Sequence, residues 1–243
     1  MNKFPVIKRM GERAILLEFE PEISENLLQK ILILKNVLEE NLLKQEVEIT
    51  NTYSSLLITY RNTIEDIYGE FFLIKQLLEK ANIEKNIERN LFHVPVCYEE
   101  EFAPDLELVA TQKKLTFEEL IDLHTAPIYT LYFIGFLPGF LYLGGLDERL
   151  HISRKNEPRL RVQKGAVGIG EKQTGIYPKM SPGGWQIIGN SPVPLFDKKI
   201  DPPCEFSAGD KLKFYSVSKE EHQQISEEVM KGNFRFKKEK YNG

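Results

Sequence analysis

The chain has 243 residues, of which 42% are hydrophobic, 11% aromatic and 28% charged, and its formal net charge is −4. This composition is typical of a globular protein with a sizeable core, and it excludes intrinsic disorder, a collagen-like helix and a coiled coil. Only the final third of the chain is basic, and only mildly, so the charge pattern excludes a nucleic-acid partner.

Targeting and metal-binding signals are missing from the sequence. Cys97 and Cys204 are too few for a disulfide framework, and no histidine or cysteine has a ligand at metal spacing, so we predict reduced thiols and no metal site. The N-terminal segment lacks the apolar stretch of a secretory signal, which indicates a cytoplasmic protein.

Residues 125–146 carry no charge, but prolines and glycines interrupt them, so we predict a buried strand and loop rather than a membrane span.

Residues 1–84 predict a small N-terminal α/β domain. Apolar runs predict strands at 14–19, 47–50 and 54–60. Ser24 is a suitable N-cap for a first helix, and Thr63 with Asp66 is typical of a capping box that opens a second. The order β-α-β-β-α is typical of a split α/β sandwich with its helices on one face of a small sheet.

The polar residues 82–91 predict a linker to a second domain over residues 92–218. This part opens with a predicted strand at 92–98 and two short helices, the second with a capping box of Thr116 and Glu119. Short apolar runs punctuated by glycine and proline follow, which predict a β-barrel or a β-sandwich. The chain is therefore assigned to the α+β class.

Residues 219–243 form the predicted C-terminal segment. It begins with an amphipathic helix, EEHQQISEEV, and continues in a charged stretch. We expect that stretch to be poorly ordered, because it offers little apolar surface to bury.

The glycine-rich stretch GAVGIGEKQTG at 165–175 invites comparison with a phosphate-binding loop. The register fails, because Glu171 precedes Lys172 and Gln173 stands where a metal-binding hydroxyl is needed. A glycine-rich strand and turn is the better interpretation.

His124 lies at the end of a predicted helix. It can serve as a general base, or it can interact with the helix C-terminal dipole, and a lone histidine favours the second role.

A basic cluster follows residue 153. Its members are Arg154, Lys155, Arg159, Arg161, Lys164, Lys172 and Lys179. A solvated strand face and an anion site explain it equally well. Because Arg159 and Arg161 alternate with apolar residues, both guanidinium groups should project from one strand face, where they can present a fork to a carboxylate or phosphate.

Turn formers and aromatic residues occur together in GFLPGFLYLGGL and in QTGIYPKMSPGGWQIIG, a composition typical of loops that shape a pocket. Trp185, the only tryptophan, can pack in the hydrophobic core or line a binding site, and we predict buried packing. Side chains that can hydrogen-bond a polar ligand are Gln173, Thr174, Tyr177 and Ser181. No pair of them forms a recognisable catalytic dyad.

Three motifs in order, HTAPIYTLYFIGFLPGFLYLGGL, PRLRVQKGAVGIGEKQTGIYP and SPGGWQIIG, resemble the family of 5-oxoprolinase B subunits. This family, often labelled allophanate hydrolase subunit 1, also includes the sporulation-kinase inhibitor KipI, and related domains form part of the carboxyltransferase portion of urea carboxylase. The resemblance implies a small α/β domain followed by a cyclophilin-like β-barrel.

The resemblance also implies an activity. Together with partner subunits A and C, such a chain opens 5-oxoproline to L-glutamate and uses ATP as its magnesium complex. This chain has no biotin attachment motif. No catalytic residue is carried over, since the active site can be shared with a partner. The residues expected to bind substrate are His124, Arg159, Lys164, Lys172, Gln173, Thr174, Tyr177, Ser181 and Trp185.

Two alternatives accompany this interpretation. A KipI-like chain inhibits the autophosphorylation of a histidine kinase, and an exposed apolar patch would then dock the kinase. That patch would consist of Phe136, Leu137, Pro138 and Phe140. Prolyl isomerisation ranks behind both, because a cyclophilin-like fold does not confer that activity.

Overall fold

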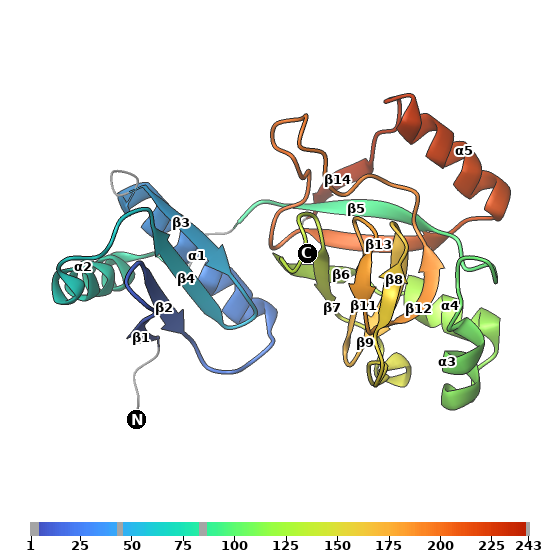
Figure 1. Cartoon of the computed structure of the whole chain (residues 1–243), viewed down its shortest axis with the longest axis horizontal. Coiled ribbons are helices and arrows are strands. Elements are labelled where there is room, and N and C mark those ends of the chain that lie inside the picture. The colour runs from blue at the N-terminus through green and yellow to red at the C-terminus, as the bar shows by residue number, and fades with distance from the viewer. Residues whose placement is uncertain (1–4, 43–45, 83–86, 242–243) are drawn as a thin grey trace. The chain divides into compact units, whose positions relative to one another are not determined.

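The computed structural model describes residues 5–42, 46–82 and 87–241, and the chain divides into two compact units, Met1–Ile87 and Glu88–Gly243 (Figure 1). Both units combine helices with sheets, so the α+β class is confirmed. Within the predicted linker, residues 83–86 lie outside the described residues, and residues 89–91 belong to a strand of the second unit.

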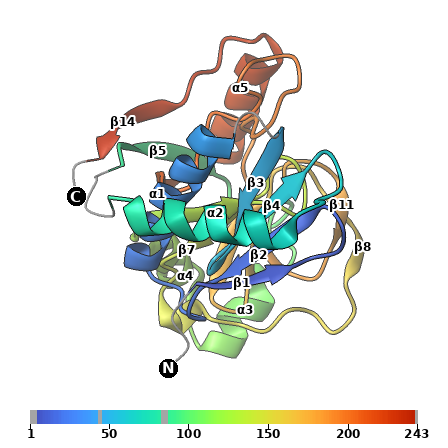
Figure 2. The same ribbon diagram turned by 90° about the vertical axis from the view of Figure 1, so that its left-hand side faces the viewer.

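The first unit contains a four-stranded antiparallel sheet in the order β1-β2-β4-β3. Its elements are β1 (Val6–Arg9), β2 (Ala14–Glu18), α1 (Glu25–Leu42), β3 (Val47–Asn51), β4 (Ser55–Tyr60) and α2 (Ile67–Lys80). The helix α1 packs against β3, β4 and α2, and Figure 2 views the unit from the side of α2. Strand β1 was not predicted, because its four residues alternate too briefly to stand out, and it extends the order to β-β-α-β-β-α.

The two helix starts of this unit are set by different caps. Ser24 Oγ accepts the Leu27 N–H at 3.2 Å, as predicted. The predicted cap at Thr63 is wrong: helix α2 begins after Asp66, whose carboxylate accepts the Gly69 N–H at 2.9 Å. An aspartate here both satisfies an open N–H and places negative charge at the positive end of the helix.

The second unit is built on an eight-stranded mixed sheet in the order β12-β9-β10-β7-β6-β13-β5-β14, with a two-stranded β11-β8 sheet beside it. Its strands are β5 (Arg89–Val96), β6 (Tyr129–Ile134), β7 (Leu141–Gly144), β8 (Arg159–Val162), β9 (Ala166–Gly170), β10 (Gln173–Ile176), β11 (Ser181–Gly183), β12 (Gln186–Asn190), β13 (Lys211–Ser216) and β14 (Lys237–Tyr241). Its helices are α3 (Leu106–Lys113), α4 (Phe117–Thr125), the short 3₁₀ helix η2 (Glu148–Leu150) and α5 (Lys219–Met230).

The sheet curls so that the chain just after β5, its next-to-last strand, meets β12 at the opposite end of the strand order. Only β13 and β5 pair in parallel among the described strands, and Cys97, just after β5, forms an antiparallel bridge with Asn190 of β12. The core beneath the sheet contains fully buried residues such as Phe92, Leu131 and Phe214. The finer description of this unit as a cyclophilin-like barrel stays a prediction.

The local predictions in this unit hold, with one exception. The Thr116–Glu119 capping box is present in full at the start of α4, and residues 125–146 form β6, a loop and β7. Across the described parts of the chain, no helix combines the length and apolarity that a membrane span needs.

The exception is the C-terminal segment, which we expected to be poorly ordered. Residues 237–241 form β14 and pair antiparallel with β5, while Phe236 is buried against Phe92 at a ring distance of 5.8 Å. The pairing satisfies backbone groups on the open edge of β5, so residues 237–241 are ordered although most of their side chains are charged.

Candidate functional site

A cavity of about 290 Å³ in the second unit is walled by aromatic side chains from separate loops and strands. Its lining residues are Phe136, Phe140, Tyr142, Arg154, Pro158, Tyr177, Pro182, Gly183, Gly184 and Trp185. This volume is at the lower end of the range for small-molecule sites, roughly 300 to 1,000 Å³, and it favours a ligand of amino-acid size over a nucleotide. We call it the aromatic cavity.

Four rings hold one another in fixed orientations around this cavity. Phe140 is 2% exposed, and its ring meets Tyr177 at 5.2 Å and Trp185 at 5.4 Å, with interplanar angles of 87° and 83°. Tyr142 meets Phe140 at 4.9 Å. Edge-to-face packing of this kind is favourable beyond the area it buries, so the aromatic walls are rigid.

The indole of Trp185 lies on a platform of glycines from β9 and β10. A Cβ atom at Gly170 would come within 2.5 Å of the Trp185 Nε1, and one at Gly175 would come within 3.1 Å of the indole ring. The missing side chains therefore make room for the ring, which is 4% exposed and both packs in the interior and walls the cavity.

Substituting Gly170 by alanine should displace the indole and lower the free energy of unfolding of this unit by about 1–3 kcal/mol, because the added methyl has no free space. Trp185 is the only tryptophan, so its emission in a urea titration reports the change directly. The control is Gly184→Ala, where the nearest atom to the new Cβ is 3.6 Å away. Equal losses in the two variants would argue against the platform.

The phenols of the aromatic cavity are neutral donors. Burial raises the pKa of Tyr142 and of Tyr177, and the nearby Arg154 guanidinium opposes that rise only in part. The Tyr177 oxygen accepts the backbone N–H of Trp185, so its own proton can be donated into the cavity.

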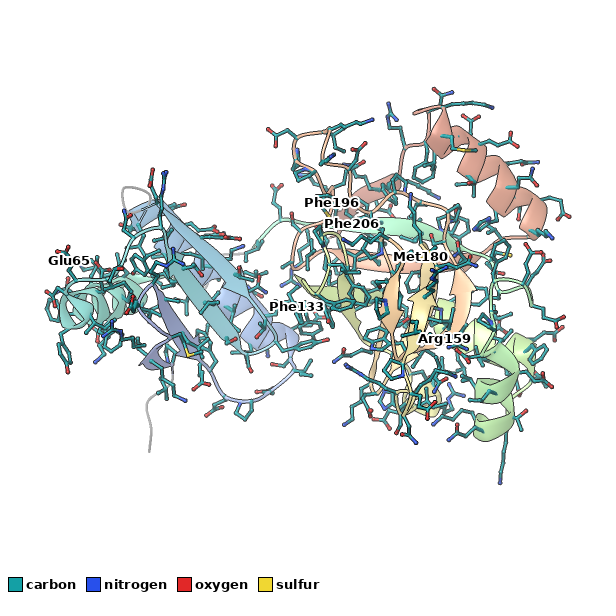
Figure 3. All side chains as sticks on the ribbon, in the orientation of Figure 1. Glu65, Phe133, Arg159, Met180, Phe196 and Phe206 are labelled. Carbon is teal, nitrogen blue, oxygen red and sulfur yellow. The ribbon has the colours of Figure 1, made fainter. Side chains whose placement is uncertain are left out.

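A buried ion cluster around Asp105 is linked to the cavity through Lys155, whose N–H donates to the carbonyl of the lining residue Gly184 at 2.7 Å. The Asp105 carboxylate is 2% exposed, and Arg159 on β8 (Figure 3) donates to both of its oxygens at 2.6 Å. Lys155 adds a contact of 2.9 Å and the Ile187 N–H one of 2.7 Å. Burial alone raises the pKa of Asp105, but these hydrogen bonds outweigh it and hold that pKa below its ordinary value.

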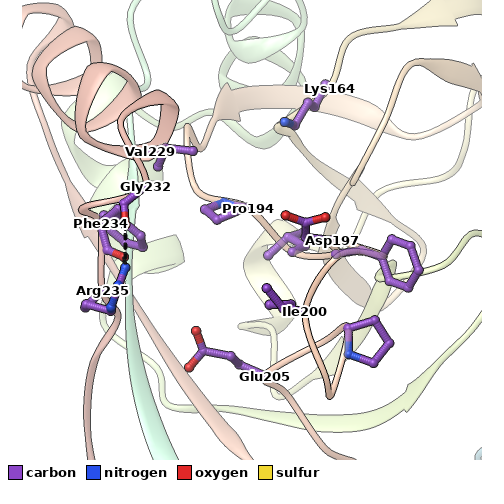
Figure 4. Close-up of a pocket in the computed structure, with 12 residues that line it drawn as sticks. Lys164, Pro194, Asp197, Ile200, Glu205, Val229, Gly232, Phe234 and Arg235 are labelled. Carbon is purple, nitrogen blue, oxygen red and sulfur yellow. Dashed lines mark hydrogen bonds between the residues drawn. The ribbon is translucent and has the colours of Figure 1, made fainter.

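Two further hollows in this unit differ from the aromatic cavity. One of about 130 Å³ is lined by Arg159 and Arg161, so the two arginines share a face, as predicted. The fork of Arg159 is nevertheless occupied by Asp105. The other, a groove of about 520 Å³ beside the end of α5, carries charges of both signs, among them Lys164 and Asp197 (Figure 4).

His124 and Thr174 lie in the core and line none of these three hollows. Tyr98 Oη and His124 Nδ1 are 2.7 Å apart, His124 Nε2 and Thr174 Oγ1 are 2.9 Å apart, and Thr174 donates to the Gly168 carbonyl at 3.1 Å. Because the Thr174 proton is used there, His124 carries its proton on Nε2 and accepts from Tyr98 on Nδ1. Burial lowers the pKa of His124 to about 3, so the ring is neutral.

The remaining predicted site residues are dispersed. Lys172 is exposed in the turn between β9 and β10, and the Gln173 Oε1 is buried with no hydrogen-bond partner among the described residues. Ser181 is buried and donates to the Pro182 carbonyl at 3.2 Å. Of the nine predicted substrate-binding residues, Tyr177 and Trp185 line the aromatic cavity.

The predicted docking patch is only partly exposed. Phe136 is 62% exposed and Pro138 is exposed, whereas Leu137 is partly buried against a hydrophobic cluster. The buried members of that cluster are Phe140, Val162, Ala166, Tyr177, Trp185 and Ile187. The expected exposure of Phe140 is wrong, because its ring fills the centre of that cluster.

Sequence reasoning missed Tyr142 and Arg154 as lining residues of the cavity. Arg154 belongs to the basic cluster, but the argument from strand alternation selected Arg159 and Arg161, which lie in a regular strand. Tyr142 lies in one of the aromatic-rich motifs, and only its distance of 6.2 Å from Trp185 in the folded chain marks it out.

Comparisons with known proteins agree on the family. A family model described as carboxyltransferase domain, subdomain C and D, matches residues 5–206. The B subunit of 5-oxoprolinase from Bacillus subtilis (strain 168) is 36% identical over 232 residues, which cover 91% of this chain and 97% of that protein. The protein of the same name from Escherichia coli O157:H7 is 35% identical over 205 residues, covering 84% of this chain and 93% of its own length.

A solved structure supports the fold. The crystal structure of Kluyveromyces lactis urea carboxylase is similar with a TM-score of 0.80 at 21% identity, over 97% of this chain and 24% of that one. The resemblance found in the three motifs is thus confirmed by whole-chain comparison. The chain belongs to the carboxyltransferase subdomain C and D family and, within it, to the family of 5-oxoprolinase B subunits.

Proposed function

We propose that this chain is the B subunit of an ATP-dependent 5-oxoprolinase, which opens the lactam of 5-oxoproline to L-glutamate. Relatives of that name match nearly the whole chain. The observation that carries the site assignment is the aromatic cavity, whose volume of about 290 Å³ suits a small cyclic amino acid. The cavity binds and orients the lactam against its rigid rings.

ATP supplies the activation that an amide needs, because an amide carbonyl is a poor electrophile. The glycine-rich stretch at 165–175 does not fit a triphosphate. It forms β9, a tight turn and β10, and three of its glycines, Gly168, Gly170 and Gly175, pack against Trp185. Glu171, in that turn at a φ of 57°, adds a negative charge. The proposal therefore assigns nucleotide binding to the partner subunits A and C.

The experiment is ATP-dependent release of glutamate from 5-oxoproline by this chain mixed with its A and C partners, and by the same mixture without it. We expect release in the complete mixture and none when this chain is omitted. Undiminished release without the chain would refute the proposal.

A second candidate function is docking to a histidine kinase, in line with the KipI resemblance. The observation that favours it is the 62% exposure of Phe136 at the edge of the aromatic cavity, with the exposed Pro138 in the same loop. A kinase autophosphorylation assay with added chain tests it. Inhibition that Phe136→Ser abolishes would support docking, and inhibition unaffected by that change would place the contact elsewhere.

A further inference from the structure

Arg154 is a cation in the lining of the aromatic cavity without a carboxylate partner among the residues that the structure describes. Its guanidinium carbon lies 5.8 Å from the centre of the Trp185 ring. Its charge opposes the rise that burial causes in the pKa values of Tyr142 and Tyr177, so it is near both phenols. The cavity thus combines one guanidinium group without a carboxylate partner among the described residues, phenolic hydrogen-bond donors and apolar ring faces.

The neighbouring cation Arg159 is already neutralised. Both of its terminal nitrogens donate to Asp105, which is nearly inaccessible to solvent. A carboxylate ligand would have to break two short charged hydrogen bonds before Arg159 could donate to it, whereas Arg154 can donate to a carboxylate directly.

The backbone on both sides of Arg154 is fixed. The Ser153 carbonyl accepts from the Gln186 side chain at 3.1 Å, and the Lys155 N–H donates to the Gly184 carbonyl at 2.7 Å. The Lys155 ammonium is held in turn by Asp105 at 2.9 Å. An arginine on a backbone held in this way loses less conformational freedom on binding than one on a mobile loop.

We propose that Arg154 is the specificity-determining residue of the aromatic cavity and pairs with the carboxylate of a small cyclic amino acid whose ring lies against the aromatic walls. The assignment of that ligand as 5-oxoproline rests on the proposed function. Tyr177 donates its phenolic proton to a second polar atom of the ligand. Arg154 recognises the ligand in this scheme and takes no part in proton transfer.

Trp185 provides the readout, because the only tryptophan of the chain walls the cavity. The purified chain is titrated with 5-oxoproline and with 2-pyrrolidinone, which has the same lactam ring and no carboxylate, while the indole emission is recorded. We expect 5-oxoproline to bind roughly 10- to 100-fold more tightly, and Arg154→Gln to remove that preference, since a charge-assisted pair has about this effect.

The matched control is Arg149→Gln, which removes an exposed arginine paired with Asp147 outside the cavity and should leave both titrations unchanged. Equal binding of the two compounds to the wild-type chain, or an unaltered preference in Arg154→Gln, would overturn the proposal, as would a lack of response to 5-oxoproline. Glutamate release by the complete mixture tests the proposed function separately from the role of Arg154. If the mixture releases glutamate but Arg154→Gln still prefers 5-oxoproline over 2-pyrrolidinone, only the role of Arg154 is rejected. If Arg154→Gln loses that preference but the wild-type mixture releases no glutamate, only the proposed function is rejected.

Discussion

Replacing Asp105 by alanine should lower the free energy of unfolding of residues 88–243 by about 3 kcal/mol. The change leaves Arg159 and Lys155 without their shared partner, and it leaves the buried Ile187 N–H without an acceptor. Removing one member of a buried ion pair costs about 3–5 kcal/mol, and the lower end applies because the two cations are 29% and 23% exposed.

Trp185 emission in a urea titration measures this loss, since it follows the unit that contains the cluster. The control is Glu205→Ala, which breaks a pair with Lys238 whose side chains are 38% and 49% exposed. That pair should contribute less than about 1 kcal/mol. Similar losses in the two variants would show that the Asp105 cluster contributes no more than a surface ion pair.

Local sequence patterns predict most of the helices and strands, because helix caps and apolar periodicity depend on residues that are close together in the chain. The capping box of Thr116 and Glu119 involves four consecutive residues, and it appears as expected. Strand β14 was missed because KKEKY has no apolar alternation, and it forms only because the distant strand β5 offers an open edge. Edge pairing of this kind leaves no signal in the paired segment itself.

The candidate site was less predictable, because its parts come from separate stretches of chain. Alternation correctly placed Arg159 and Arg161 on one face. It could not show that Asp105, which is 54 residues earlier than Arg159, occupies the fork of that arginine. Arg154 lies outside any regular strand, so no periodic pattern marks it, and only the folded cavity separates it from the other basic residues.

Acidification from pH 6.5 to pH 4 should lower the free energy of unfolding of residues 88–243 by about 3 kcal/mol through His124 alone. In the folded chain burial lowers the pKa of His124 to about 3, whereas the unfolded chain has the ordinary value of 6.5. Below pH 6.5 the unfolded state therefore binds a proton that the folded state does not. The stability is complete above pH 6.5 and falls as the pH drops through this window toward 3.

The contribution of His124 to this acid sensitivity is tested by urea titrations of the wild type and His124→Gln at pH 7 and pH 4, with Trp185 emission as the signal. That variant should be less stable than the wild type at pH 7, because a flexible amide replaces the imidazole that contacts Tyr98 and Thr174 and stacks on Phe214. It should nevertheless lose about 3 kcal/mol less between the two pH values. The control Tyr98→Phe removes the hydrogen bond between Tyr98 and His124 but retains the buried imidazole, so it should keep the steep acid dependence. His222, whose pKa burial also lowers, is present in all three proteins and cancels in the comparison. Equal acid dependence in the wild type and His124→Gln would mean that other groups, and not the neutral imidazole enclosed by Tyr98 and Thr174, set the acid stability of this unit.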